Sequence, residues 1–208
     1  MSGRSLAILG AGGHARVVAD CAEQAGWSGI VFFDGSDLPP PPGPWPLVGT
    51  PADLMARLAE FDGVIVGIGD NAERLDRHRR LSEAGARMVG LIHPRASVSP
   101  HAEVGEGSVV LAGACVGVGA RLGQAVIVNT NATIEHDDDL ADGVHVSSGA
   151  VLAGGVRVGE RGWIGAGAVV RPGVVLGRDV RVGAGAAVVA PVADGLTVVG
   201  VPARRLDH

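Results

Sequence analysis

The pattern of apolar and polar positions changes once along the 208-residue chain, near residue 92. Before that point, short apolar runs alternate with segments in which apolar residues recur at helical spacing. This alternation predicts an α/β domain with a small parallel, Rossmann-like sheet whose faces are covered by helices. The expected strands are 6–9, 30–34, 64–69 and 88–92, the expected helices are 17–25, 51–61 and 70–85, and a proline-rich surface loop spans 39–46.

From Val98 to Val188 an aliphatic residue occupies every sixth position, in sixteen consecutive matches without a slip. The residue four positions further on is usually small or Val, and the residue directly after the aliphatic one is often Gly. A sustained short period of this kind indicates a repeat architecture, in which each hexad is a short strand followed by a turn. Three hexads would close a triangular coil, and sixteen would stack into a prism about 25 Å long at the roughly 4.8 Å spacing of neighbouring strands.

The change of period predicts three segments. The α/β domain occupies 1–92, a parallel β-helix occupies 93–194, and a C-terminal tail, 195–208, closes the end of the helix. A prism with open ends and smooth faces would otherwise associate without control. We therefore expect its faces to be buried by self-association.

Composition excludes several classes of function. The net charge of −5 argues against a general nucleic-acid binder, and the absence of Lys among the 17 basic residues rules out lysine-based catalysis. No apolar run approaches the roughly 20 residues of a membrane span, so no membrane partner is expected. The two cysteines, Cys21 and Cys115, form no disulfide framework, and the run at 6–9 is too short for a signal sequence. Both observations favour a cytoplasmic protein.

One hexad, residues 134–139 with the sequence IEHDDD, departs from the repeat. Asp138 stands where almost every other hexad has a small or apolar residue, and His136 lies next to Asp137. Carboxylates raise the pKa of a neighbouring His and orient its ring, which suits a general base. A solvated acidic turn is the alternative interpretation, but a departure from a monotonous repeat favours a functional role.

A second histidine, His145, follows nine residues after His136, which is half of an 18-residue coil. The two rings should therefore lie on different sides of one prism and could meet only across a subunit interface; an exposed corner His is the alternative. Charge is also uneven, with one Arg and seven acids in 97–149 but seven Arg and four acids in 150–208. The second half of the prism could accept an anionic ligand such as coenzyme A, or be an ordinary solvated face.

The turn GAGGHA at 10–15 approximates a phosphate-binding fingerprint, and it lies between an expected strand and an expected helix. Asp34 ends the next strand, where a contact to ribose or base is common. About 90 residues are too few for a full dinucleotide fold, so a single nucleotide diphosphate fits better than NAD. A tight turn without a ligand is the alternative.

The chain resembles the hexapeptide-repeat sugar acyltransferases of the sialic-acid O-acetyltransferase type, and among them the bacterial nucleotide-sugar N-acetyltransferases of the bacillosamine and perosamine pathways. The resemblance rests on the segments ILGAGGHARVVAD, VFFDG, VGIGDNAERL, LIHPRASVSPHAEVG, VNTNATIEHDDDL, HVSSGAVLAGGV and VVGVPARRL. It implies a left-handed β-helix, an exception to the right-handed crossover rule, and a homotrimer with active sites between subunits. It further implies direct transfer, in a ternary complex, from acetyl-CoA to the 4-amino group of a nucleotide-linked amino-deoxy sugar.

The resemblance also implies roles for single residues. His136 would be the general base toward the sugar amine, and Asp137, where relatives often have Glu, would orient it. No catalytic metal is implied, and neither Cys lies in the two histidine motifs, which argues against an acyl-enzyme. The residues implied to meet coenzyme A are His145, Gly154, Ala166 and Ala184, and those implied to hold the nucleotide sugar are Gly12, Gly13, His14, Asp34, Gly35, Gly69 and Asn129.

Other functions fit the residues less well. A hydratase of the γ-carbonic-anhydrase type needs three His on zinc, but His101, His136 and His145 are separated by 35 and 9 residues and would not stack. A non-catalytic scaffold or nucleotide-sugar-binding module would not need a corner with His beside an acid. An O-acetyltransferase acting on a sialic acid or another sugar hydroxyl stays open, because the same base and donor would serve it. UDP- and GDP-linked substrates are equally compatible with Asp34.

Overall fold

The computed structural model describes residues 3–35 and 42–206. It divides the chain into two compact units, residues 1–94 and residues 95–208. Within the described residues, no helix combines the length and the apolar character needed to cross a membrane.

The N-terminal unit contains the expected parallel sheet, with one difference in its strands. The expected segment 88–92 does not form a full fourth strand, because only Met88 bridges to Val64 before the pairing ends. A three-residue strand that the sequence pattern did not reveal extends the opposite edge of the sheet, beside the second strand. The sheet order is β3-β2-β1-β4, with β1 (Arg4–Leu9), β2 (Trp27–Phe33), β3 (Leu47–Gly49) and β4 (Gly63–Val66). The next strand along the chain, β5 (Leu91–Ile92), is not part of this sheet.

Two helices of this unit begin at residues whose side chains cap them. The backbone N–H of Asp53 donates to the Thr50 hydroxyl, and the Thr50 N–H donates to the Asp53 carboxylate at 2.7 Å, which completes a capping box. Asp70 caps the next helix by accepting from the Glu73 N–H at 2.9 Å. Of the expected proline-rich loop, residues 39–41 lie outside the described residues. The helices are α1 (Gly13–Gln24), α2 (Pro51–Ala56) and α3 (Asn71–Glu83), with a 3₁₀ turn over Leu58–Glu60.

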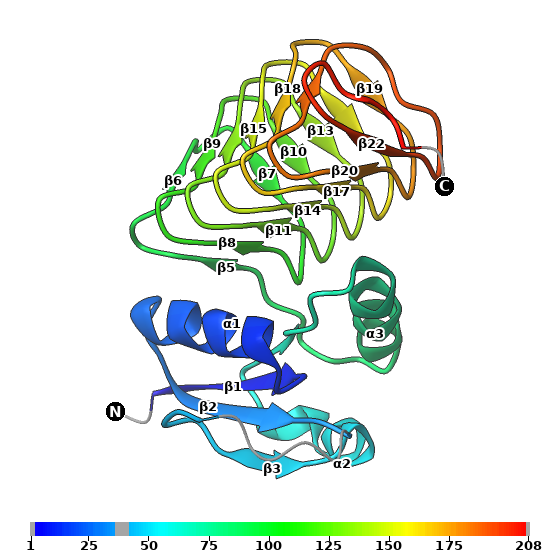
Figure 1. Cartoon of the computed structure of the whole chain (residues 1–208). Coiled ribbons are helices and arrows are strands. Elements are labelled where there is room, and N and C mark those ends of the chain that lie inside the picture. The colour runs from blue at the N-terminus through cyan, green and yellow to red at the C-terminus, as the bar shows by residue number, and fades with distance from the viewer. Residues whose placement is uncertain (1–2, 36–41, 207–208) are drawn as a thin grey trace. The chain divides into compact units, whose positions relative to one another are not determined.

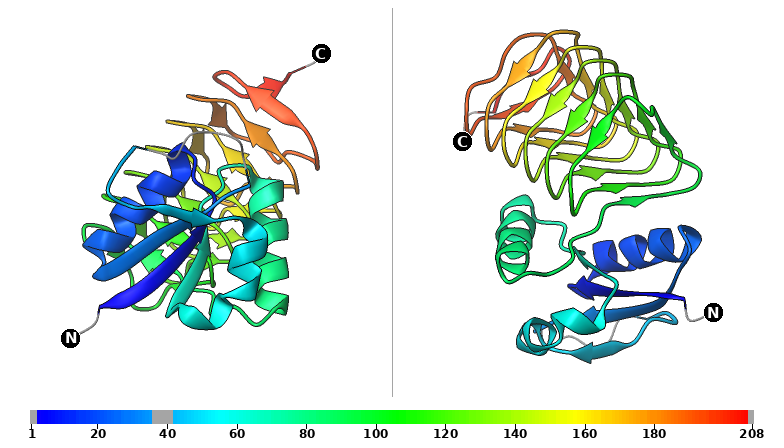
Figure 2. Two further views of the ribbon diagram at one scale, coloured as in Figure 1. Left: turned by 90° about the horizontal axis from the view of Figure 1, so that it is seen from below. Right: turned by 180° about the vertical axis from the view of Figure 1, so that it is seen from behind.

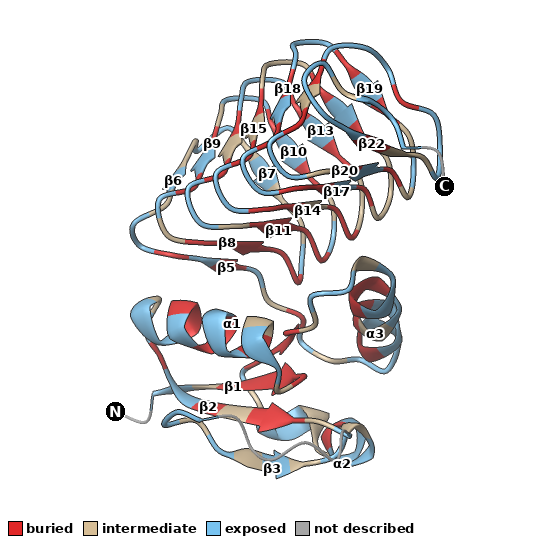
Figure 3. Cartoon of the chain, in the orientation of Figure 1, coloured by how far each residue is buried: buried red, intermediate tan, exposed pale blue. Residues whose placement is uncertain are grey.

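The core of this unit lies on both faces of the sheet, because strand residues alternate between them. Leu9 and its neighbours on one face pack with Leu54 of α2 and Leu81 of α3. On α1, buried residues line one side and exposed residues the other (Figure 3). The end of β4 comes very close to α1: a Cβ added to Gly67 would lie 2.8 Å from the Cα and Cβ of Ala15. The glycine therefore lets the N-terminus of α1 approach the ends of the strands.

The second unit is a parallel β-helix, which confirms the predicted architecture. Sixteen two-residue strands, from β6 (Ser97–Val98) to β21 (Ala187–Val188), fall one in each hexad, and each strand from β6 to β18 pairs with the strand 18 residues later. The coils stack in register in both views (Figures 1 and 2). The intervening strands are β7 (Glu103–Val104), β8 (Val109–Val110), β9 (Cys115–Val116), β10 (Arg121–Leu122), β11 (Ile127–Val128), β12 (Thr133–Ile134), β13 (Asp139–Leu140), β14 (His145–Val146), β15 (Val151–Leu152), β16 (Arg157–Val158), β17 (Trp163–Ile164), β18 (Val169–Val170), β19 (Val175–Leu176) and β20 (Arg181–Val182).

Three flat faces enclose the interior of the β-helix. We call them face 1 (β6, β9, β12, β15, β18, β21), face 2 (β7, β10, β13, β16, β19) and face 3 (β8, β11, β14, β17, β20). Figure 1 shows the strands of face 3 side by side. At the C-terminal end β22 (Thr197–Val199) extends face 3 and β23 (Arg204–Arg205) pairs with it in the antiparallel sense. Val198 is buried there, and Leu196 and Ala203 pack against the interior.

Glycine serves two different purposes in the hexads. Directly after the aliphatic residue it permits close approach: a Cβ on Gly117 would lie 2.8 Å from the backbone of Glu135 and His136 in the next coil. Two positions later, at the corner, it permits a left-handed backbone, as at Gly119 with φ of 72°. Asp137 holds this second position with φ of 61°, although it carries a side chain.

The interior of the β-helix is lined by the aliphatic residues and by the small or Val residues predicted from the repeat. Two of these inward positions carry polar side chains, Ser108 and Asp138, and both are fully buried. The Ser108 hydroxyl accepts from the Val126 N–H and donates to the Gly123 carbonyl, each at 2.8 Å. An inward polar side chain can therefore join one coil to the next.

Candidate active site

The corner between β12 and β13 brings His136 and Asp137 into contact. The Nδ1 atom of His136 lies 2.8 Å from a carboxylate oxygen of Asp137, and both side chains are largely exposed. An ionised carboxylate only accepts, so Nδ1 carries the proton and Nε2 of the neutral ring has its lone pair available. The hydrogen bond from Asp137 raises the pKa of His136, and the nearby negative charges add to this effect. The pair therefore has the geometry of an oriented base.

The backbone of Asp137 is strained. A left-handed φ costs a residue with a side chain roughly 1 kcal/mol, and most other corners use Gly at this position. Strain of this type gathers at functional sites, where a side chain is needed at a turn that favours Gly. At this corner the side chain supplies the partner of His136.

Asp138, the residue that first marked this hexad as unusual, points inward rather than toward the histidine. Its two carboxyl oxygens accept from the N–H of Val156 at 2.8 Å and from the N–H of Glu135 at 3.0 Å. Burial raises the pKa of Asp138 to about 7, against the two hydrogen bonds, which lower it. Its contacts join the His136 corner to the next coil.

His145 lies on face 3, so the structure places it on a different face from the corner of His136. The side-chain amide of Asn129 lies 3.3 Å from its Nε2, and the Asn129 oxygen accepts from the Thr130 N–H at 2.7 Å. The amide therefore presents its NH₂ group to His145, whose Nε2 accepts. Asn129, assigned from the sequence to the sugar group, lies in the structure beside His145.

One residue of face 3, Trp163, was missed by the sequence reasoning, and Arg181 was counted only as one of the seven arginines in 150–208. Trp163 and Arg181 follow His145 at successive intervals of 18, which is the signal that could have found them. The indole lies 6.4 Å from the His145 ring and donates to the Ser147 hydroxyl at 2.9 Å. The Arg181 guanidinium lies 5.8 Å from the indole centroid. Face 3 thus presents a column of imidazole, indole and guanidinium groups.

The other residues predicted to meet coenzyme A form two groups. Gly154 lies one coil after His136, at the same corner. Ala166 and Ala184 are exposed and lie on successive coils of the corner that follows face 3, where the Gly185 N–H donates to the Ala166 carbonyl at 2.9 Å. Within one chain, the predicted residues thus divide between the His136 corner and the region of His145.

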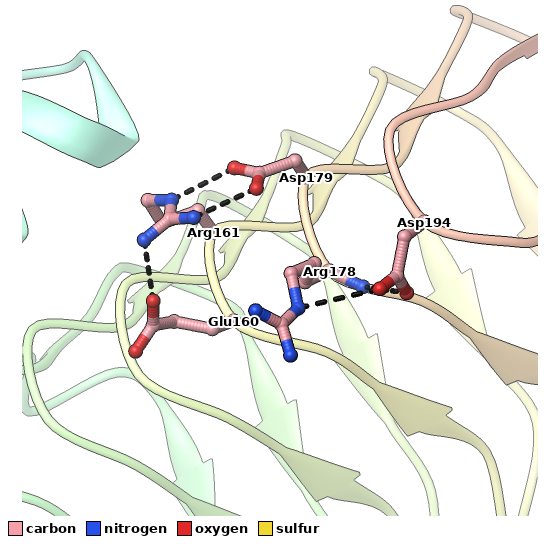
Figure 4. A network of polar contacts seen from close by, with 5 residues as sticks. All are labelled: Glu160, Arg161, Arg178, Asp179 and Asp194. Carbon is pink, nitrogen blue, oxygen red and sulfur yellow. Dashed lines mark hydrogen bonds and ion pairs between the residues drawn. The ribbon is translucent and has the colours of Figure 1, made fainter.

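The arginines predicted to attract an anion are not equally available. Arg161 makes two hydrogen bonds of 2.7 Å to Asp179 and also pairs with Glu160 (Figure 4). Arg178 pairs with Asp194 at 3.3 Å. Arg161 and Arg178 therefore join neighbouring coils at a corner. Arg181 instead lies over Trp163, in the same column of face 3 as His145.

The N-terminal unit contains a cavity of about 650 Å³ at the ends of its strands. Glu73 and Arg77 of α3 also line it, and the sequence reasoning did not foresee them. One oxygen of Asp34 accepts from the N–H of Ala11 at 2.7 Å, so this acid also holds the glycine turn. All six nucleotide-sugar residues predicted for this unit line the cavity: Gly12, Gly13, His14, Asp34, Gly35 and Gly69.

His14 is neutral in this cavity, because burial and, to a smaller extent, the nearby cation of Arg74 lower its pKa to about 4. Arg74 itself is 1% exposed and was missed by the sequence reasoning. It donates to the carbonyls of Ile68 and Gly69, at 3.2 and 3.0 Å, and to the side chain of Asn71. A buried arginine thus shapes the loop that forms one edge of the cavity.

Neither region offers a metal centre: in the part of the chain that the structure describes, no three His, Cys, Asp or Glu side chains gather as possible ligands.

Comparison with known proteins assigns the family. Residues 5–81 match the protein family described as the PglD N-terminal domain. The acetyltransferase domain of PglB from Neisseria gonorrhoeae is 42% identical with a TM-score of 0.92, over 98% of this chain and 100% of that one. GDP-perosamine N-acetyltransferase from Caulobacter crescentus, in complex with CoA and GDP-perosamine, is 35% identical with a TM-score of 0.94, and both chains are covered fully.

A third structure, WeeI from Acinetobacter baumannii, shares 24% identity and the fold, with a TM-score of 0.87 over 97% of this chain and 99% of that one. The first two relatives are similar over nearly their whole length, and their likeness includes both units. The chain therefore belongs to the sugar N-acetyltransferases of the bacillosamine and perosamine type, and it is an acetyltransferase.

Proposed function

We propose that the protein transfers the acetyl group of acetyl-CoA to the 4-amino group of a nucleotide-linked amino-deoxy sugar, with His136 as the general base. The observation that carries the proposal is the 2.8 Å contact between His136 and Asp137 at an exposed corner. The ligands of the relatives support it, since one PglB structure holds acetyl coenzyme A and the perosamine enzyme was solved with CoA and GDP-perosamine.

The reaction needs one base and good positioning. The amine nitrogen attacks the thioester carbonyl carbon, a C–N bond forms and the C–S bond breaks. Nε2 of His136 takes the proton that the amine loses, and the coenzyme A thiolate leaves and receives a proton. Because acetyl-CoA is already activated, positioning supplies much of the rate, and a general base adds about 10²–10⁴-fold. Direct transfer needs no acyl-enzyme intermediate.

The cavity of the N-terminal unit is our candidate for the nucleotide sugar. Its volume of about 650 Å³ is in the range of small-molecule sites. Backbone N–H groups at the N-terminus of α1 suit a diphosphate, and Asp34 and neutral His14 can hydrogen-bond the remaining groups. His145, with its Nε2 turned to Asn129, can donate from Nδ1 to the thioester carbonyl.

We also propose a homotrimer, because the outward side chains differ in character between the faces of the β-helix. Outward residues of face 2 alternate in sign along the register Glu103, Arg121, Asp139 and Arg157, which suits contact with water. The outward column of face 1 carries no charged side chain and is mostly apolar, with Val151, Val169 and Ala187 in successive coils, whereas Val175 is the one apolar residue in the column of face 2. Packing face 1 of one subunit against face 3 of the next would bring His136 toward the neighbour's His145. Such a contact between different surfaces closes into a ring.

The test is a free-thiol assay with acetyl-CoA and a panel of UDP- and GDP-linked 4-amino sugars, with free sialic acid beside them. We expect coenzyme A release with one of the amino-sugar nucleotides and an N-acetyl product by mass spectrometry. Release with sialic acid alone would assign O-acetylation instead. In mixed trimers, His136→Ala and His145→Ala chains should restore part of the activity. No rescue in verified mixed trimers would contradict sites that span two subunits.

A further inference from the structure

The residue two positions after each inward aliphatic residue begins a corner of the β-helix. Across the sixteen hexads this position is occupied by Pro, Glu, Ala, Val, Gln, Thr, His, Asp, Ser and Arg, and by Gly only at 154. The backbone of Gly154 is not left-handed. Neither the fold nor the turn therefore requires glycine at 154, and its presence needs another cause.

The cause is the side chain of His136, which lies at the same corner in the preceding coil. His136 precedes Gly154 by 18 residues, and the Gly155 N–H donates to the His136 carbonyl at 2.9 Å. A Cβ added to Gly154 would lie 2.4 Å from Nε2 of His136, 2.6 Å from Cε1 and 2.8 Å from Cδ2. All three distances are far below van der Waals contact. The imidazole thus occupies the volume that a side chain at 154 would fill.

We propose that Gly154 is a positioning residue whose missing side chain admits the His136 ring in the orientation that keeps Nδ1 on Asp137 and sets Nε2 above the Gly154 backbone. This inference rests on the proposed function of His136. It differs from a backbone contact between Gly154 and coenzyme A, because a backbone contact survives the addition of a methyl group. The steric effect does not.

The proposal predicts an unusual combination for Gly154→Ala. The imidazole is the free end of a side chain, so it can rotate away and leave the coils undisturbed. The melting temperature should therefore stay the same or rise. In the wild type the hydrogen bond to Asp137 raises the pKa of His136. The displaced ring should lose this bond, so the pKa of His136 measured by NMR should fall. We expect kcat to fall about 10–100-fold, since part of the 10²–10⁴-fold of a general base is lost, with KM for both substrates within about threefold.

Two controls and one measurement without substrate make the test specific. Ala190→Ser adds one atom at the same hexad position two coils beyond Gly154, and should leave kcat and the His136 titration unchanged. In a His136→Ala background, Gly154→Ala should have no further effect on kcat. The His136 titration needs no substrate, so it reports on the ring even if the substrate panel gives no turnover.

The outcomes separate the two proposals. Wild-type kcat and an unshifted His136 pKa in Gly154→Ala would overturn the positioning role, and so would a rise of KM for acetyl-CoA alone or a clear loss of melting temperature. Full activity of His136→Ala would instead overturn the proposed base. In that case a shifted ring in Gly154→Ala would still establish the steric relation between the two residues.

Discussion

In the N-terminal unit the candidate site is a cavity to which several strand ends and helix termini contribute, whereas in the β-helix it is a single corner of one coil. The two histidines show what this difference does. His14 is partly buried, and this burial together with the cation of Arg74 lowers its pKa to about 4; His136 is exposed, and its hydrogen bond to Asp137 raises its pKa. A cavity thus yields a neutral imidazole that can hydrogen-bond a ligand, while an exposed corner yields an imidazole whose pKa depends on one neighbour.

The largest expected effect separates these two roles. His136→Asn should lower kcat by about 10²–10⁴-fold, because it removes the general base. His14→Asn should act mainly on KM for the nucleotide sugar, by about tenfold, the value of one lost hydrogen bond. Steady-state kinetics with each substrate varied in turn would measure both. Equal effects on kcat from the two variants would contradict the division of roles between the units.

The next prediction concerns the neighbour that sets the strength of the base. Asp137→Gly should lower kcat about 10–100-fold and shift the acidic limb of the pH–rate profile to lower pH. The sign follows because a base works when deprotonated: wild-type activity is lost as pH falls through the raised pKa of His136, and loss of Asp137 lowers that pKa.

The same variant should not lose stability, since glycine relieves the left-handed backbone at 137. The matched control is Ala125→Gly, at another corner with φ of 52°. Because the Ala125 methyl group is buried, its loss offsets most of the gain of about 1 kcal/mol from the relieved backbone, so the variant should change stability little and leave the pH profile unchanged. A destabilised Asp137→Gly protein would show that the carboxylate supports the coil as well as His136.

A smaller effect should come from the cavity. Asp34→Ala removes the acceptor of the Ala11 N–H, so the glycine turn is held less firmly. We expect KM for the nucleotide sugar to rise about tenfold, in line with about 1.5 kcal/mol for a hydrogen bond to a charged group. KM for acetyl-CoA should not change. Isothermal titration with UDP and GDP would measure the binding directly, and unchanged affinity for both would remove Asp34 from the site.

The two units also differ in how far the sequence predicts them. The hexad period leaves little freedom, because residues 18 apart must pair, and the exceptional corner at His136 is visible against fifteen regular hexads. In the α/β unit, β3 has only three residues, and its sequence LVG shows no alternation of apolar and polar side chains. The burial of Arg74 depends on carbonyls that turn toward it only in the folded loop. Tertiary contacts of this type leave no periodic signal in a sequence.

Asp138 marked its hexad as unusual in the sequence, but in the structure its carboxyl group contacts the backbone N–H groups of Glu135 and Val156 rather than His136. The Asp138 pKa of about 7 in the fold lies above the ordinary value of about 3.9. The folded protein therefore keeps a proton that the unfolded chain releases between about pH 4 and 7, and this group's contribution to stability is lost as pH rises across that window.

Asp138→Ser tests this account, because Ser108 shows that a hydroxyl at an inward position can accept from the next coil. In the variant, the free energy of unfolding should lose a pH dependence of about 1–2 kcal/mol. This is less than the full pKa shift of Asp138 would give, because two backbone N–H groups favour the ionised form. Urea unfolding of both proteins at pH 5 and pH 7.5 would measure it. We expect wild type to lose stability relative to Asp138→Ser as pH rises. Parallel curves would mean that Asp138 is ionised throughout and that the coil is joined by a buried carboxylate rather than by a carboxylic acid.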